Sequence, residues 1–168
     1  MKKDPELQVS DDQIDEWIDE IVEKGYHYLE NMTYDTIEKD KQMALQDYPV
    51  ELREEWLNSL KQYRVVYSIQ DIVLGSFTRW LVWSKHNQPT EPSLLCGDTL
   101  HHGGVLTHIR FSETNVFCHI MFNYRRNIRA MITFNDTVLF QKISNEEHMV
   151  LLANENRDNN DSDSVRYT

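Results

Sequence analysis

The sequence predicts an α+β protein in which N-terminal helices precede a small, antiparallel, barrel-like sheet of five strands, and a C-terminal helix follows the sheet. Apolar residues recur with helical period over Ile14–Val22 and Leu52–Tyr63 but are irregularly spaced between them, and β-branched and aromatic residues dominate from Val65 onwards, with a period of two in the later strands. A new helix start follows at Ser144. A chain of 168 residues can bury about two thirds of its unfolded surface, so no metal or disulfide is needed to explain a fold.

Three helices are predicted before the sheet. The first covers residues 10–25, because Ser10 and Gln13 have the spacing of a capping box and Gly25 ends the apolar stripe. The second runs from a cap at Asp35 to Ala44. The third follows Pro49, with apolar residues at helical spacing: Leu52, Trp56, Leu57, Leu60 and Tyr63.

Five strands are predicted after the helices, joined mostly by short polar turns. Asn135-Asp136 has the chemistry of a two-residue hairpin, and Ser144 with Glu147 forms a capping box for the closing helix. The predicted strands are residues 77–83, 105–111, 116–122, 128–134 and 137–143, and residues 85–104 between the first two are a long loop.

The predicted organisation has four parts. These are a flexible N-terminus (1–9), an acidic helical segment (10–64), an antiparallel β-domain with its closing helix (65–156) and a disordered acidic tail (157–168). The tail is expected to be disordered because a segment of Asn, Asp and Ser cannot offset its chain entropy by burial.

Charge is distributed unevenly along the chain. Residues 1–60 hold 17 acids and 6 bases, residues 61–144 hold 5 and 9, and residues 145–168 hold 6 and 2. No secretory signal and no apolar run of membrane-spanning length occurs, so we expect a soluble intracellular protein, cytoplasmic or nuclear, without membrane contact. A helical segment this acidic is typical either of a solvated helix face or of a surface that steers a partner.

The sequence lacks the common catalytic signatures. It has five glycines and no glycine-rich phosphate loop, no Gly-x-Ser-x-Gly and no His-Glu-x-x-His, which disfavours nucleotide-dependent and common hydrolytic enzymes. We therefore expect no catalytic residue and no cofactor.

Soft and imidazole side chains gather around the long loop and the strands after it. Zinc binds such ligands, but their spacing matches no paired half-site, and Cys118 and His119 point to opposite faces of a strand. We expect no metal site at this group, which is Cys96, His101, His102, His108, Cys118 and His119.

One basic and aromatic group is a candidate for binding single-stranded nucleic acid. Small β-barrels combine cations that follow the phosphates with aromatic rings that stack on bases. The candidate residues are Arg79, Trp80, Arg110, Tyr124, Arg125, Arg126 and Arg129. The alternative is that arginines at a hairpin only keep a sheet edge soluble.

Part of the sequence resembles a set of small uncharacterised proteins of large double-stranded DNA viruses of protists and algae. The resemblance covers residues 75–153 and rests on Gly75–Trp80, Gly103–Leu106, Cys118, Phe134–Ser144, Glu147 and Leu151–Leu152. It implies a viral small-barrel protein without an assigned activity, present in host cytoplasm or virion.

The sequence thus favours a non-catalytic module for protein interaction or structure, with a protein partner. Binding of single-stranded nucleic acid is the alternative.

Overall fold

The computed structural model describes residues 26–82, 99–123 and 125–164, with side chains to residue 157. The chain divides into two compact units, which are Asp35–Ile143 and Met1–Tyr34 together with Ser144–Thr168. We call the first the sheet unit and the second the terminal unit. The predicted boundary between residues 64 and 65 does not coincide with this division, and the predicted helix at 10–25 and flexible segment 1–9 lie outside the described residues.

Two helices belong to the sheet unit, α2 (Tyr34–Ala44, whose first residue lies in the terminal unit) and α3 (Val50–Ser59). Both confirm the predicted helical segments, although α3 ends four residues before Tyr63. The Leu60 carbonyl, which follows the last helical turn, accepts hydrogen bonds from the Tyr63 N–H at 3.0 Å and from the buried Lys41 ammonium at 2.9 Å, and Lys41 also donates to Glu38. A cation at this place satisfies a carbonyl group that the helix itself leaves unpaired.

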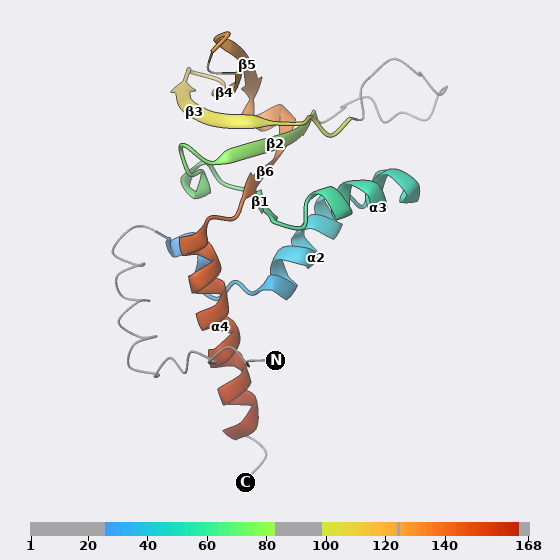
Figure 1. The fold of residues 1–168 in the computed structure, drawn as a ribbon, viewed down its shortest axis with the longest axis vertical. Helices are drawn as coiled ribbons and strands as arrows, with labels where there is room; N and C mark the ends of the chain where they lie inside the picture. Colours follow the sequence, from blue (N-terminus) through green and yellow to red (C-terminus); the bar gives the residue numbers. More distant parts are fainter. Residues whose placement is uncertain (1–25, 83–98, 124, 165–168) are drawn as a thin grey trace, which may run out of the picture. The chain divides into compact units, whose positions relative to one another are not determined.

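The sheet is antiparallel and has six strands rather than the predicted five. Their spatial order is β1-β6-β2-β3-β4-β5, with β1 and β5 at the two edges, so within the described residues the sheet is open and not closed into a barrel (Figure 1). The strands are β1 (Tyr63–Val66), β2 (Phe77–Val82), β3 (Gly104–Phe111), β4 (Val116–Asn123), β5 (Ile128–Thr133) and β6 (Thr137–Lys142).

The unpredicted strand is β1, because helical spacing assigned Tyr63 to the third helix and the first predicted strand began only at residue 77, although β-type sequence was recognised from Val65. Its aromatic and β-branched residues, Tyr63, Val65 and Val66, favour extended backbone, and all four of its residues pair with β6. The pairing is extended by a hydrogen bond from the Ile143 N–H to the Gln62 carbonyl. Tertiary pairing thus overrides the local helical pattern at this point.

The predicted hairpin at Asn135-Asp136 is wrong. Residues Phe134–Asp136 form a 3-10 turn, η3, after which β6 crosses the sheet and pairs with β1 and β2 instead of β5. Phe134 packs against buried residues of the sheet, and the Thr137 hydroxyl donates to the Thr133 carbonyl. These contacts direct the chain across the sheet, where a two-residue hairpin would have returned it along β5.

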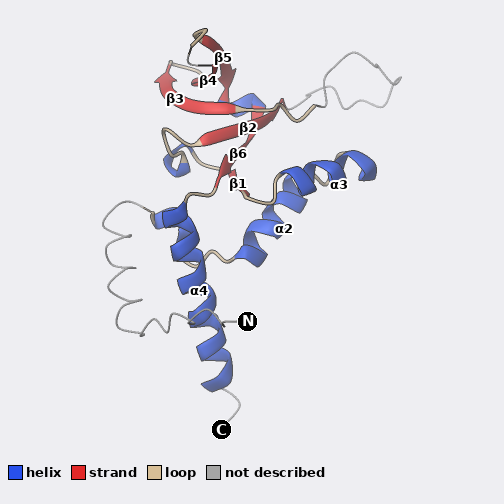
Figure 2. Ribbon diagram, viewed as in Figure 1, coloured by secondary structure: helices blue, strands red, loops and turns tan. Residues whose placement is uncertain are grey.

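Two apolar clusters form the core of the sheet unit. One joins α2 and α3 to β1, β2 and β6 and includes Leu45, Trp56, Leu60, Val65, Leu81, Leu100 and Phe140. The other joins β3 and β4 to the centre of the sheet and comprises Val66, Trp80, Leu106, Cys118, Ile120 and Leu139. Figure 2 shows the resulting separation within the unit, with α2 and α3 beside β1 and away from β3 to β5.

Two glycines allow the start of β3 to lie close against both of its neighbours, β2 and β4. Gly103 has a φ of +90°, and a Cβ there would lie 2.4 Å from the Thr78 carbonyl oxygen. A Cβ on Gly104 would lie 2.5 Å from the Met121 carbonyl oxygen. His101–Gly103 therefore lead directly into β3, whose first residue, Gly104, was predicted as part of the loop, and only glycine fits at these two close approaches.

A row of buried polar side chains crosses β1, β6 and β2. Arg64, Gln141 and Thr78 are paired in register and are almost wholly buried. The Gln141 amide accepts from the Val73 N–H and donates to the Val73 carbonyl, at 2.9 and 3.0 Å, while the Arg64 guanidinium donates to the Asp71 carbonyl. These bonds fix the connection between β1 and β2 to the sheet.

The terminal unit joins η1 (His27–Leu29) to α4 (Asn145–Ser164). The predicted capping box at the start of α4 is confirmed, because the Ser144 N–H donates to Glu147 Oε2 and the Glu147 N–H donates to Ser144 Oγ. Glu147 also accepts a 2.6 Å hydrogen bond from the Tyr28 hydroxyl, and Asn154 donates to the Leu29 and Met32 carbonyls. These contacts attach the N-terminal turn to the helix.

α4 is longer than the sequence predicts. It continues to Ser164, whereas disorder was expected from Arg157. Among the described side chains, Val150, Leu151 and Asn154 of its first half are buried. Across the described ranges, no helix combines the length and the apolarity that a bilayer crossing demands.

Candidate interaction surface on strands β3 to β5

The register of β3, β4 and β5 creates a surface with mixed chemistry. On β4, Cys118 and Ile120 are fully buried, so the residues alternating with them point to the opposite side. Cross-strand partners share a face, which extends this side over all three strands. We call it the outer face, and it comprises Val105, His108, Arg110, Phe117, His119, Met121, Arg129, Met131 and Thr133.

A β-bulge in β3 determines which residues reach the outer face. Leu106 pairs with Ile120, but His108 pairs with His119, so Thr107 is an extra residue in β3. In a regular ladder that continued from the Leu106–Ile120 pair, Thr107 would pair with His119, and His108 would pair with Cys118 and point to the core. A bulge of this kind turns a side chain to the other side of a strand, and bulges are common beside functional sites.

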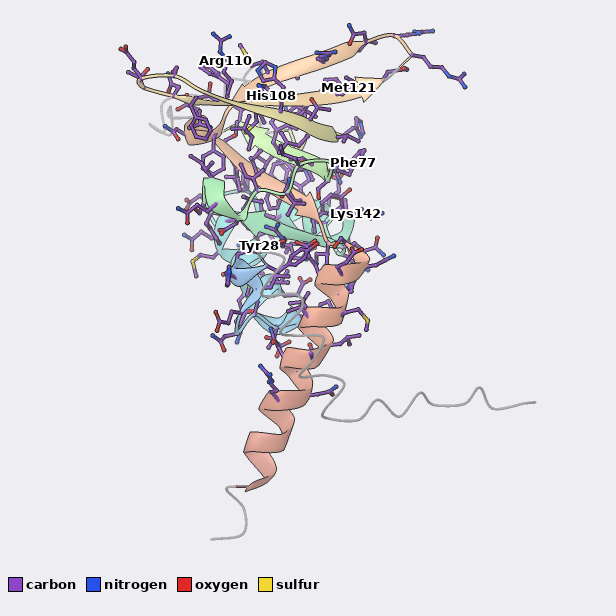
Figure 3. All side chains as sticks on the ribbon, turned by 90° about the vertical axis from the view of Figure 1, so that its left-hand side faces the viewer. Tyr28, Phe77, His108, Arg110, Met121 and Lys142 are labelled. Atoms are coloured by element: carbon purple, nitrogen blue, oxygen red, sulfur yellow. The ribbon has the colours of Figure 1, made fainter. Side chains whose placement is uncertain are left out.

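The outer face is not covered by the helices of the sheet unit. Both α2 and α3 pack in the cluster on β1, β2 and β6. Met131 is 59% exposed, and His108, Arg110 and Arg129 are exposed, whereas Phe117 and His119 are partly buried and Met121 is buried. Figure 3 shows Arg110, His108 and Met121 along the upper strands.

The turn between β4 and β5 presents two further arginines. The Asn123 side chain accepts hydrogen bonds from the Arg125 and Arg126 N–H groups, and Asn127 has the left-handed φ of +51°. Arg129 Nε donates to Asn127 Oδ1 at 2.8 Å. The predicted turn at residues 123–127 is therefore present, and its asparagines leave both Arg125 and Arg126 exposed.

Two of the candidate nucleic-acid-binding residues are committed to the fold. Trp80 is 3% exposed and stacks on the His101 ring, with centroids 4.6 Å apart, so its ring has no free face for a base. Arg79 donates to the backbone carbonyls of His101 and Ser59. Sequence reasoning missed this, because alternation alone does not show that residues 99–102 run beside β2.

Of the other candidates, Arg110 and Arg129 lie on the outer face, and Arg125 and Arg126 on the adjoining turn. Tyr124 lies outside the described residues. The structure thus brings Arg125, Arg126 and Arg129 together at one end of the outer face and leaves Arg110 near the other end, opposite Phe117. It adds outer-face residues that the sequence did not nominate for nucleic acid, above all Phe117, Met131 and the histidines. The period-two alternation of β4 and β5 was the signal that could have found them.

Charge is separated between the two units. The sheet unit, residues 35–143, contains 12 acidic and 12 basic residues and is neutral, so the net charge of −11 lies in residues 1–34 and 144–168. Within the sheet unit, residues 104–133 contain four arginines and one glutamate, a net charge of +3. The outer face and its turn therefore attract acidic groups although the whole protein is acidic.

The histidines and cysteines lie in different environments. Burial raises the pKa of the Cys118 thiol to about 11, and burial together with the neighbouring His102 lowers the pKa of His101. In the described part of the chain, no group of three or more His, Cys, Asp or Glu side chains is placed to hold a metal ion, and Cys96 lies outside that part. Cys118 and His119 do point to opposite faces, as predicted.

His119 has an unusual environment on the outer face. Its ring is 5.6 Å from the His108 ring, between centroids, and its Nε2 atom is buried without a hydrogen-bond partner in the described residues. An unsatisfied buried polar atom costs about 1–3 kcal/mol, so it is a place where a ligand could stabilise the protein.

The fold defines an α+β protein with a six-stranded antiparallel sheet. Comparisons with protein-family models, with curated proteins and with solved structures found no match to this chain. The resemblance to viral proteins therefore stays a prediction.

Proposed function

We propose that this protein is a non-catalytic interaction module that binds a protein partner through the outer face of β3 to β5 and the Arg125–Arg126 turn. The observation that carries the proposal is the outer face that α2 and α3 leave uncovered, on which Arg110 lies opposite Phe117 and Arg129 lies two residues before the exposed Met131. Fully solvated faces of an antiparallel sheet are mainly polar, whereas this one mixes cations with apolar side chains, as interfaces do.

The chemistry of the face defines the partner. Four arginines and one glutamate in residues 104–133 favour a polypeptide segment with acidic side chains. Phe117 and Met131 favour apolar residues among those acids, since apolar anchors supply most of the binding energy at such surfaces. The occupant we propose is an acidic segment with interspersed apolar residues.

Binding of single-stranded nucleic acid is the second candidate. The four arginines on β3, β5 and the turn between β4 and β5 favour it, because phosphate contacts supply most of the affinity for nucleic acid. Burial of Trp80 and the bonds of Arg79 weigh against it, since they remove a stacking ring and a cation from the candidate set.

Selection from a random peptide library on the full chain tests the proposal. We expect enriched peptides to be acidic and apolar, and to lose binding at least about tenfold when Arg125, Arg126 and Arg129 are changed to Ala. The control carries the same charge change at three exposed lysines outside the face, Lys39, Lys61 and Lys142, and should bind as the wild type does. Equal losses in both triple variants would contradict a specific face.

A titration with labelled single-stranded oligonucleotide at two salt concentrations separates the candidates. We expect no micromolar affinity at physiological salt. Micromolar binding that the arginine variant abolishes, with a salt dependence reduced by roughly three counterions, would replace the protein partner by nucleic acid.

A further inference from the structure

We propose that His108, His119 and Met131 form a copper(I)-binding site at the centre of the outer face. The inference goes beyond the proposed function and does not depend on it, because it rests on these three side chains alone. The sequence led us to expect no metal at these histidines, and the bulge at Thr107 changes that expectation.

The three residues form one cross-strand row. His108 of β3 is the register partner of His119 of β4, and His119 is the register partner of Met131 of β5. Opposite residues in an antiparallel sheet have Cβ atoms about 4.5–5.5 Å apart on the same face. Three potential ligands from three adjacent strands therefore converge without any change of backbone.

The distance between the two imidazoles fits a shared ion. A metal ion binds an imidazole nitrogen at about 2.0–2.1 Å, so two rings on one ion have centroids no more than roughly 6.5 Å apart. The His108 and His119 centroids are 5.6 Å apart, with the ring planes inclined by 59°. Inclined rings at this separation can direct one nitrogen each at a common point.

Two independent features of the backbone and the side chains support the site. The extra residue Thr107, whose hydroxyl donates to the His119 carbonyl, is what places His108 opposite His119. His119 Nε2 is a buried nitrogen without a hydrogen-bond partner in the described residues, and a metal ion would satisfy it.

The ligand set favours copper(I) over zinc. Thioether sulfur is a soft ligand that selects copper(I), while imidazole suits both metals. Zinc sites use Cys, His, Asp and Glu, and the described residues contain no group of three such side chains placed for a metal. Arg110 and Arg129 flank the row, and they repel a divalent cation more strongly than a monovalent one.

Met121 can supply a second thioether. It lies two residues from His119 on β4, on the same face and diagonal to Met131. Diagonal neighbours on a sheet are about 7–8 Å apart between Cα atoms, within reach of a long side chain. The site thus offers two imidazoles and up to two thioethers.

The test is anaerobic competition for copper(I) held by bicinchoninate, with the untagged full chain. Every protein carries Cys96→Ser, because a thiolate would compete for copper(I). We expect one copper(I) per chain, lost with His119→Asn and weakened about tenfold or more by Met131→Leu, which keeps the volume of the side chain. The matched control is Met43→Leu, whose exposed fraction of 61% resembles the 59% of Met131, and it should bind as the parent does.

X-ray absorption at the copper edge gives the readout that stability changes cannot mimic. We expect a sulfur neighbour in the parent protein and in Met43→Leu, and its loss or depletion in Met131→Leu. The proposal is overturned by binding well below one copper(I) per chain, by an unchanged affinity of Met131→Leu, or by zinc(II) displacing copper(I) at equal concentration.

Discussion

The two halves of the sheet differ in what lies on them. Strands β1, β6 and β2 carry α2 and α3 on one face, through Leu81 and Phe140, and the loop pinned by Gln141 on the other. Strands β3, β4 and β5 bury one face and leave the other to arginines, histidines and Met131. The comparison teaches that one continuous sheet can serve for stability in one half and for recognition in the other.

Side-chain chemistry follows this division. Where both faces are covered, polar residues such as Gln141 occur with complete hydrogen-bond partners. On the outer face, polar and apolar residues are mixed, and the buried Nε2 atom of His119 has no hydrogen-bond partner among the described residues. The same kind of substitution should therefore change the free energy of unfolding more in the helix-covered half than on the outer face.

The largest contrast is expected from two truncations of similar size. Leu81→Ala in the helix-covered half should lower the free energy of unfolding by about 2–5 kcal/mol, because Leu81 is fully buried. Met131→Ala on the outer face should change it by less than about 0.5 kcal/mol. Denaturant unfolding of both variants measures the difference, and equal losses would show that the outer face is covered in solution.

The second-largest effect on stability is expected at Gly103, where β3 of one half begins beside β2 of the other. Gly103→Ala brings a Cβ to 2.4 Å from the Thr78 carbonyl oxygen, whereas Gly75→Ala, at a similar φ of +85°, meets no atom within 4 Å. Alanine is strained at the positive φ of both positions. The difference between the two variants in the free energy of unfolding therefore measures the effect of the close approach alone. We expect Gly103→Ala to unfold more easily by a further 1–3 kcal/mol, roughly the cost of overpacking. Equal thermal stability of the two would mean that β2 and β3 can separate at no cost.

The smallest effect is expected from Cys118, at the buried side of the open half. Burial raises its pKa from 9.0 to about 11 in the folded protein, so the folded state retains the thiol proton more tightly than the unfolded state. Its contribution to stability is complete below pH 9 and is lost as the pH rises through about 11. Between pH 8 and 11 the free energy of unfolding should therefore decline more steeply in the wild type than in Cys118→Ala. Parallel curves of this free energy against pH would contradict a buried thiol.

Much of the fold was predictable because its signals are local. Alternation placed five of the six strands, and the capping box of Ser144 and Glu147 placed the start of α4. Strand β1 and the crossing of β6 were missed, because both depend on pairing between residues far apart in the sequence, such as Arg64 with Gln141 and Val82 with Thr137. No local pattern reports such pairs.

The candidate site was only partly predictable for the same reason. The exposed arginines at 125, 126 and 129 were nominated correctly as neighbours on one turn and strand. The burial of Trp80 and the position of His108 were not, since the first depends on residues 99–102 lying beside β2 and the second on one extra residue in β3. A bulge leaves no signature in composition or period.

The double hydrogen bond between the Gln141 amide and the backbone of Val73 also constrains how this chain can diverge. A side chain that pairs with a backbone N–H and carbonyl together acts as a one-residue strand and fixes a single point of the connection between β1 and β2. Insertions and deletions on either side of Val73 leave that pairing intact, whereas a change of Gln141 to Glu removes the donor and brings a carboxylate against a carbonyl oxygen. Among chains that share this fold, we therefore expect the lengths of the two flanking segments to vary and the glutamine to persist.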